Sequence, residues 1–254
     1  FTASAHSTAA CFEAGCKPPS LSSSHAPQPP KAAVFLLFDI SGSTSSPSVR
    51  QLYARDLNKV IDALEGHVIV VGDKITYNTM ATATFPISSE LPPYNPLRTN
   101  ALEYRKKLAA EKQKLLAQGE ALVKETGAEK QTDLMNALQL AADKLSGEQC
   151  ASAAHKDLVL FSDMIEQSTH VDLTTEQLTP ERIKGLIASE KRAGRLPVLT
   201  GVKVWITGAT VAPKGSLSPE RIRQIKSSWL AYFAACGADL SADRYAPALT
   251  VFTL

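Results

Sequence analysis

The feature that most constrains this fold is a continuous apolar stretch, residues 32–38, which ends abruptly in Asp39. A run of this length without polar interruption is typical of a central strand covered on both faces. It is also far too short to cross a bilayer. A strand of this kind needs packing on each side, so the rest of the chain must supply two layers around it.

Helix-like and strand-like segments alternate along the remainder of the chain. Apolar residues at intervals of three and four predict helices, whereas short apolar runs predict strands. The expected helices are 47–64, 99–126, 133–145, 179–192 and 218–235, and the expected strands are 32–38, 67–73, 79–85, 157–163, 201–208 and 246–254.

This alternation predicts one α/β domain over residues 32–254, with a doubly wound, mostly parallel six-stranded sheet and helices on both faces. The short link between 67–73 and 79–85 predicts an antiparallel hairpin. Residues 1–31, rich in Ser, Ala and Pro, are interpreted as an extended arm or linker. The segment at about 86–130, with its long charged helix, is interpreted as an elaboration of the domain.

The charge balance gives no support to one broad class of function, binding to nucleic acid. The chain carries 27 basic and 25 acidic residues, for a net charge of +2. Binding to nucleic acid usually requires a clustered basic face, and this composition gives no reason to expect one.

Three polar residues at alternate positions follow the first strand: Asp39, Ser41 and Ser43. Carboxylate and hydroxyl oxygens suit Mg²⁺, Mn²⁺ or Ca²⁺ rather than zinc. Gly42 allows the turn to tighten, and the helix expected near Pro47 directs its N-terminus to the same place. The alternative interpretation is that these side chains merely cap that helix.

Two later residues extend the pattern. Thr132 stands just before an amphipathic helix in "QTDLMNALQLAADKL", and Asp163 ends a strand in "LVLFSDM". In the order Asp39, Ser41, Ser43, Thr132 and Asp163, the set resembles the metal-ion-dependent adhesion site of the von Willebrand factor type A domain. The resemblance covers roughly residues 32–254 and involves all five positions of the motif.

The resemblance implies a divalent-ion site, with Mg²⁺ expected and Mn²⁺ or Ca²⁺ as alternatives. Ser41 and Ser43 would bind the ion directly, Thr132 directly or through water, and Asp39 and Asp163 through water. Water or an Asp or Glu of a partner protein would fill the remaining position.

The resemblance also implies that 79–85 is the antiparallel edge strand of the sheet. Many relatives have Asp-Gly after the third strand, whereas this chain has Asp163-Met164, which predicts a differently shaped loop. The loops 44–48, 128–131 and 164–170 are expected to form the rim that selects a partner.

We therefore expect a metal-dependent protein-binding module for adhesion or assembly, not an enzyme. The alternative is a metal-dependent phosphoryl-transfer or phosphatase enzyme. A haloacid-dehalogenase-type enzyme would need a second Asp where this chain has Ser41, which cannot act as an acid or base. A nucleotide site would need a glycine fingerprint, which "DISGSTSS" does not match.

The cysteines and the first residues bear on localisation. We expect Cys150 to pair with Cys236, and Cys11 with Cys16, although free buried thiols are the alternative. "FTASAHSTAAC" contains an Ala-x-Ala pattern like a signal-peptidase site, and Cys11 also allows a lipid anchor. Both observations favour export to the periplasm, cell surface or medium, and a trimmed cytoplasmic chain is the alternative.

Overall fold

The apolar stretch forms the central strand of a five-stranded sheet in the computed structural model, which describes residues 30–77, 79–95, 97, 99–125, 131–168, 171–209 and 217–254. The strands are β1 Ala32–Asp39, β2 Val68–Ile75, β3 Ile87–Leu91, β4 His155–Phe161 and β5 Val202–Thr207. Their order across the sheet is β3-β2-β1-β4-β5. β3 is antiparallel to β2, and the other neighbouring strands are parallel. The predicted α/β class and mostly parallel sheet are confirmed.

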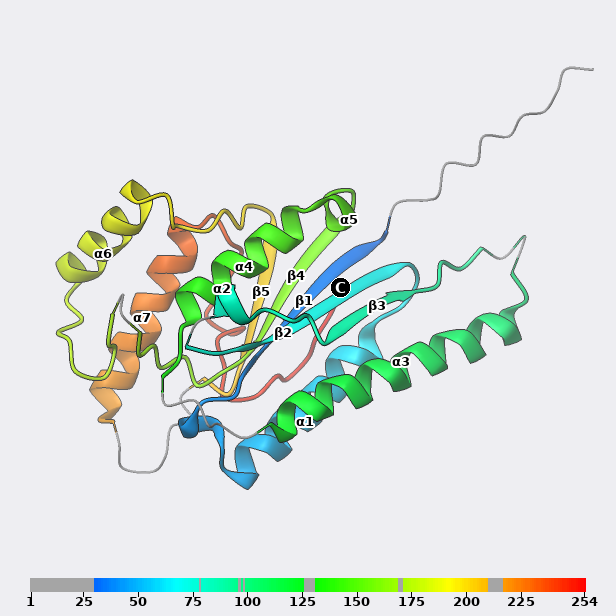
Figure 1. The fold of residues 1–254 in the computed structure, drawn as a ribbon, viewed down its shortest axis with the longest axis horizontal. Helices are drawn as coiled ribbons and strands as arrows, with labels where there is room; N and C mark the ends of the chain where they lie inside the picture. Colours follow the sequence, from blue (N-terminus) through cyan, green and yellow to red (C-terminus); the bar gives the residue numbers. More distant parts are fainter. Residues whose placement is uncertain are drawn as a thin grey trace, which may run out of the picture.

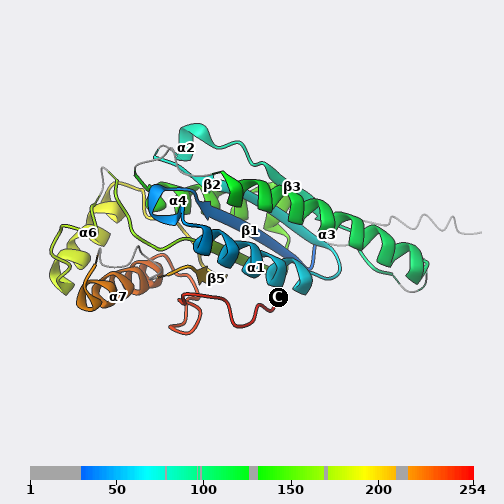
Figure 2. The ribbon, with the colours of Figure 1, turned by 90° about the horizontal axis from the view of Figure 1, so that it is seen from below.

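Helices cover both faces of the sheet (Figures 1 and 2). They are α1 Pro47–Ala63, α2 Thr79–Thr82, α3 Ala101–Lys124, α4 Leu134–Ser146, α5 Glu148–Ala151, α6 Pro180–Arg192 and α7 Pro219–Ala235, with a 3₁₀ turn at Gly42–Thr44. Figure 1 shows α4 on one side of the sheet and α1 with α3 on the other. α6 and α7 lie side by side beyond β5 in both views.

The side chains of β1 alternate between two hydrophobic cores. Ala33, Phe35 and Leu37 pack in the core shared with α4, α6 and α7. The intervening residues Ala32, Val34, Leu36 and Phe38 pack in the core shared with α1 and α3. Successive side chains of a strand point to opposite faces, so an uninterrupted apolar strand belongs where both faces are covered. All eight residues of β1 are buried.

The predicted edge strand 79–85 is wrong, and β3 takes its place in the sheet. Thr79 begins the short helix α2, where its hydroxyl accepts a hydrogen bond from the backbone N–H of Thr76 at 3.0 Å. The buried carboxylate of Asp73 accepts from the N–H groups of Thr84 and Phe85 at 2.9 and 3.2 Å. The Asp73 side chain thus binds backbone N–H groups that a β-strand would use to pair with its neighbour. Pairing with β2 begins only at Ile87.

The predicted sixth strand, 246–254, is also absent from the described sheet. Its backbone bonds β5 near the start of the segment, where the N–H of Ala246 donates to the carbonyl of Ile206 at 3.2 Å, and the N–H of Gly208, just after β5, donates to the carbonyl of Pro247 at 3.2 Å. The N–H of Leu249 instead donates to the buried carboxylate of Asp56 in α1 at 2.8 Å. The ring of Phe252 then lies 5.1 Å from that of Trp205. Residues 246–254 therefore pack against α1 and β5 without joining the sheet as a strand.

Asp56 is a buried charge that joins three parts of the chain. Its side chain is fully buried, and it accepts hydrogen bonds from the hydroxyl of Thr207 at 2.6 Å and from the N–H of Leu249. Lys59 and Arg55 contribute ion pairs at 3.0 and 3.1 Å. Burial alone would raise the pKa of this carboxyl, but these donors lower it overall.

The domain limits 1–31 and 32–254 stay predictions. Most of the predicted arm, residues 1–29, lies outside the described residues, and Lys31 already donates its N–H to the carbonyl of His67 at 2.7 Å.

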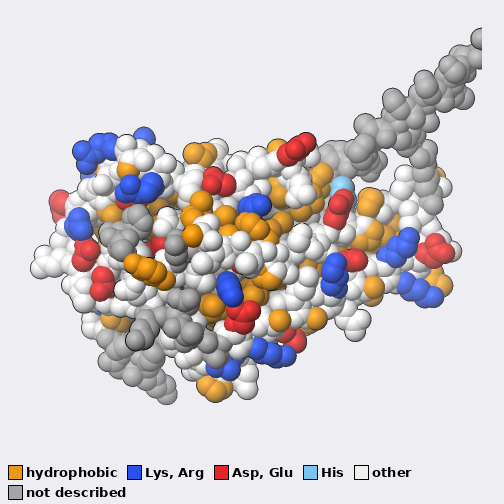
Figure 3. All heavy atoms as spheres, in the orientation of Figure 1, with side chains coloured by type: hydrophobic (Ala, Val, Ile, Leu, Met, Phe, Trp, Pro, Cys, Tyr) orange, Lys and Arg blue, Asp and Glu red, His pale blue; other side chains and the backbone are white. Residues whose placement is uncertain are grey.

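Within the described ranges, no helix combines the length and apolar character needed to span a bilayer. Acidic and basic side chains are interspersed over the face seen in Figure 3.

The predicted disulfide between Cys150 and Cys236 is wrong, because both residues are buried free cysteines. They pack in the core beside α4 and α7, where each thiol behaves as a small apolar group. Burial raises the pKa of Cys150, and it raises that of Cys236 to about 12. The predicted pair Cys11–Cys16 lies outside the described residues.

The buried thiols lead to a prediction about reactivity. In a Cys11→Ser/Cys16→Ser variant, we expect Cys150 and Cys236 to react with a thiol reagent only after unfolding, because burial excludes the reagent and suppresses the thiolate. A reductant should leave the melting temperature unchanged. Titration with and without denaturant measures this, and rapid reaction of either thiol in the native protein would contradict it.

Candidate functional site

The pairing of β1 with β4 sets the position of the candidate site. Phe38 is the register partner of Phe161, and their rings stack at a centroid distance of 4.4 Å. The next residues along the two strands, Asp39 and Ser162, are joined by a hydrogen bond of 2.8 Å from the serine hydroxyl to Asp39 Oδ2. Asp163 follows immediately. Because parallel strands end at the same edge, both predicted aspartates lie at the carboxyl edge of the sheet, as expected.

The loop after β1 folds tightly around Asp39. The N–H of Ser41 donates to Asp39 Oδ1 at 2.9 Å, and the hydroxyls of Ser41 and Ser43 are 3.0 Å apart. The hydroxyl of Thr44 contacts the carbonyls of Asp39 and Ser41 at 2.8 and 2.9 Å. Ser46, rather than the predicted residues, caps α1 by accepting from the N–H of Val49. Helix capping therefore does not account for Asp39, Ser41 or Ser43.

The loop after β4 presents Asp163 to the same region. Its Oδ1 atom accepts a hydrogen bond from the N–H of Ile165 at 3.0 Å, whereas its buried Oδ2 atom has no hydrogen-bond partner among the described residues. Met164 has a φ of 65°, in the left-handed region that glycine adopts more readily. Its N–H donates to Ser162 at 2.9 Å, and its carbonyl accepts from the indole of Trp229 at 2.8 Å. These contacts hold Met164 in its left-handed conformation.

Thr132 is buried just before α4, but its hydrogen bond to this loop involves the backbone rather than the hydroxyl. Its carbonyl accepts from the N–H of Gln167 at 3.1 Å. Glu166 binds the N–H of Leu134, at the start of α4, at 2.6 Å. Asp133 caps the helix through the N–H of Asn136 at 3.2 Å. The loop after β4 is thus fastened to the beginning of α4, next to Thr132.

Asp39 and Asp163 are two buried carboxyl groups that repel each other electrostatically at this edge of the sheet. Burial raises the pKa of Asp163, and the negative charge of Asp39 raises it further, to about 7. The Ser43 hydroxyl and the N–H of Ile165 lower this pKa, but by less. Burial also raises the pKa of Asp39, although hydrogen bonds from Ser41 and Ser162 oppose the shift. The pKa of Tyr53 rises for the same reasons, through burial and the charges of both aspartates. The site concentrates negative charge where water does not screen it.

These residues fit a hard divalent cation. The described residues hold no cluster of three or more His, Cys, Asp or Glu side chains suited to a metal, so an ion here would depend on hydroxyl oxygens. Two such hydroxyls lie together, and an unpartnered carboxylate oxygen of Asp163 is buried beside Asp39. A cation would compensate both carboxylates and the orphaned oxygen.

Several residues at this edge were missed by the sequence analysis. Ser162 orients Asp39, and it could have been found by aligning the ends of the two strands. Asp133 has the usual signal of a helix cap, an acidic residue before an apolar helical stretch. Glu166 and Tyr53 carry no local signal, since only the folded chain brings them to the loop and to the aspartates.

The two facing carboxylates predict an unusual effect of mutation. In buffer with EDTA, Asp163→Asn should increase the free energy of unfolding by about 1 kcal/mol, because it removes one of two buried like charges. Added Mg²⁺ should stabilise the unmodified chain but not the variant. Urea unfolding measures both effects.

The matched control is Asp143→Asn, which changes an exposed carboxylate on α4. It should shift the free energy of unfolding by less than about 0.5 kcal/mol, and its response to Mg²⁺ should be unchanged. Destabilisation by Asp163→Asn in EDTA would contradict the repulsion between the two carboxylates.

Comparison with known proteins gives structural similarity only. No protein-family model matches the sequence, and no curated protein matches it. Among solved structures, the chain is similar to a von Willebrand factor type A structure from Catenulispora acidiphila, at 16% identity and a TM-score of 0.35. The match covers 78% of this chain and 37% of that one.

Two further structures are similar to a comparable degree. The manganese-loaded TRAP protein of Plasmodium vivax has 16% identity and a TM-score of 0.38, over 78% of this chain and 63% of that one. An aerotolerance-related membrane protein from Bacteroides fragilis has 15% identity and a TM-score of 0.35, over 78% and 87%. Superpositions this loose say nothing about ligands or partners. What the structure itself establishes is the α/β fold that the sequence predicts, with a mixed sheet of order β3-β2-β1-β4-β5 between two layers of helices.

Proposed function

We propose that this chain is a divalent-cation-dependent protein-binding module, with Mg²⁺ as the expected ion and Mn²⁺ or Ca²⁺ as alternatives. Ser41, Ser43 and Thr132 are assigned as direct ligands, and Asp39 and Asp163 as supporting carboxylates. The observation that carries this proposal is the buried Oδ2 atom of Asp163, which lies without a hydrogen-bond partner beside a second buried carboxylate.

The donor set predicts how the site would engage a partner. Hydroxyl groups are neutral, so an ion bound mainly by hydroxyls keeps much of its positive charge. A carboxylate from another protein gains contact with that charge, and the N-terminus of α1 adds a favourable field close by. We therefore propose that an Asp or Glu of the partner completes the coordination.

Loops around the site supply the proposed rim for partner selection. They are 44–48, 128–131 and 164–170, of which 128–130 and 169–170 lie outside the described residues. Among the described parts, residues 164–167 are fixed by hydrogen bonds to Ser162, Trp229 and the start of α4. A rim with fixed parts favours recognition of one partner geometry.

The enzymatic alternative gains no support from the described residues. A haloacid-dehalogenase-type enzyme needs an acid or base two positions after Asp39, and that position holds Ser41, whose hydroxyl lies 3.0 Å from that of Ser43.

Export also remains a proposal. It has lost the support of the Cys150–Cys236 disulfide and depends on the pattern in "FTASAHSTAAC", outside the described residues.

The ion itself provides the first test of this function. Isothermal titration calorimetry should detect one Mg²⁺-class ion per chain, and Ser41→Ala or Thr132→Ala should weaken binding by about tenfold or more, because each removes a direct oxygen ligand. Ser48→Ala, which removes an exposed hydroxyl from the first turn of α1, is the matched control and should bind normally. Unchanged binding in both site variants would refute the assignment.

Carboxylate capture can be tested apart from the natural partner. With Mn²⁺ bound, a peptide carrying one Asp should lower the water-proton relaxation enhancement, because its carboxylate replaces ion-bound water. The same peptide with Asn in place of Asp should have no effect. Equal effects of the two peptides would exclude carboxylate coordination while leaving ion binding intact.

A further inference from the structure

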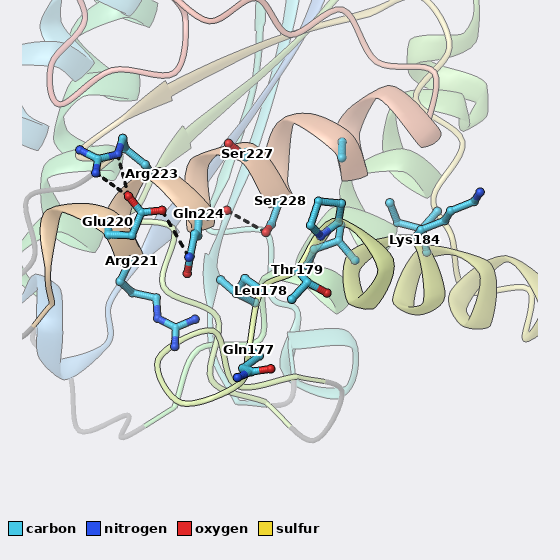
Figure 4. A pocket seen from close by; sticks show the side chains of 14 residues that line it. Gln177, Leu178, Thr179, Lys184, Glu220, Arg221, Arg223, Gln224, Ser227 and Ser228 are labelled. Atoms are coloured by element: carbon cyan, nitrogen blue, oxygen red, sulfur yellow. Dashed lines mark hydrogen bonds and ion pairs between the residues drawn. The ribbon is translucent and has the colours of Figure 1, made fainter.

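A long groove separates α6 from α7, on the part of the molecule beyond β5 (Figure 4). Its volume is about 1030 Å³, and its lining comes from residues 177–187 and from residues 220–231 of α7. The apolar part of the lining consists of Leu178, Pro180, Ile183, Ile187 and Ala231. A groove between two helices, with apolar side chains from both, can accept the apolar face of a third helix.

The floor of the groove is preformed. Leu178 and Ile183 are 8% and 7% exposed, and both belong to the hydrophobic core beneath α6 and α7. The hydroxyl of Ser228 is bonded to the carbonyl of Gln224 at 2.8 Å, so it is already satisfied within α7. In Figure 4 the side chain of Thr179 lies beside the start of α6, and those of Leu178 and Gln224 lie below α7. An occupant would thus meet an apolar floor with a few polar groups.

The charged residues of the lining give the groove a positive rim. Arg223 is neutralised by Glu220, at 2.5 Å. Arg221 instead donates to the carbonyl of Glu176 at 2.5 Å, and the carboxylate of Glu176 is bound by Arg182. Lys184, at the outer rim on α6, forms no ion pair with any described residue. Two positive charges of the lining therefore lack a carboxylate within the described structure.

The direction of the helices adds to this charge. The lining includes Thr179 and Pro180 at the start of α6, and Glu220 and Arg221 at the start of α7. The N-terminus of a helix carries a partial positive charge, which Glu181 in α6 and Glu220 in α7 offset in part, so the two helices add a modest preference for acidic groups at this end of the groove. Basic side chains beside two helix N-termini make an acidic occupant more favourable still.

We propose that the groove between α6 and α7 binds an amphipathic helical segment of a partner protein, with its apolar face on Leu178, Ile183 and Ile187 and with acidic residues toward Arg221 and Lys184. No lining residue belongs to the five proposed ion-site residues, so this contact requires no cation. It is independent of the proposed ion site and would give the module a second surface for recognition.

The test uses a defined probe with the full chain. The probe is a fluorescein-labelled peptide of about 16 residues, with Leu at i, i+3, i+4 and i+7 spacing and Glu on the opposite face. Its two comparison peptides replace Glu by Lys or scramble the Leu positions. Fluorescence anisotropy in EDTA should show saturable binding of the acidic amphipathic probe and at least about tenfold weaker binding of either comparison peptide.

Paired charge reversals locate the binding. Lys184→Glu/Arg221→Glu should weaken binding by about tenfold, since it reverses both unpaired charges of the rim. Ile187→Ser should weaken it through the apolar floor. Arg105→Glu/Lys106→Glu, on exposed positions of α3, makes the same change in net charge away from the groove and should leave affinity unchanged. Circular dichroism checks that each variant is folded.

Several results would overturn the proposal. They are absence of saturable binding, equal affinity for the Lys peptide, or equal loss in the α3 control and the groove variant. Loss of binding in EDTA would assign the probe to the ion site instead. A dimer in gel filtration that Lys184→Glu/Arg221→Glu dissociates would identify the occupant as a second copy of this chain.

Discussion

The structure depends on the parallel pairing of β1 with β4, because this register decides what meets at the carboxyl edge of the sheet. Stacked rings of Phe38 and Phe161 end the apolar part of both strands at the same level. The next residue of each strand is polar. Ser162 donates a hydrogen bond that orients Asp39, and Asp163, which follows Ser162, lies close enough for the charge of Asp39 to raise its pKa. A shift of the register would separate these groups and also exchange the faces of every side chain in the strand. Core packing and the chemistry of the site are therefore fixed by the same pairing.

Much of the fold could be predicted from the sequence because its elements carry strong local patterns. The apolar run of β1, the Ser-Pro-Glu start of α7 and the Thr-Pro-Glu start of α6 each specify an element by themselves. The two strand errors share one cause. At 79–85 and 246–254 the apolar pattern suits a strand, but Asp73 and Asp56 bind backbone N–H groups of these segments. Those bonds join distant parts of the chain, so no local rule detects them.

The candidate site could be predicted only as far as its residue types and order. Spacing placed Asp39, Ser41 and Ser43 in one loop, and the structure brings Asp163 to them. The burial that raises the pKa of Asp163 follows from the surrounding packing and has no counterpart in the motif. Likewise, Glu166 accepts a hydrogen bond from the backbone at the start of α4, and the residues next to Glu166 in the sequence do not predict this contact. The cysteine pairing failed for a related reason, since spacing along the chain does not specify burial as free thiols.

Asp56 has a consequence for the order in which the molecule can be completed during synthesis. The carboxylate lies in α1, one donor comes from the end of β5, and another comes from Leu249, which is 193 residues further along the chain than Asp56. Before residues 249–252 emerge from the ribosome, a nascent domain with α1 already against the sheet would lack one protein donor to this carboxylate. Water can take the place of the Leu249 donor until residues 249–252 arrive and cover the carboxylate. Docking of residues 249–252 therefore completes the hydrogen bonding of Asp56 and, through Leu249 and Phe252, the second core at the same time.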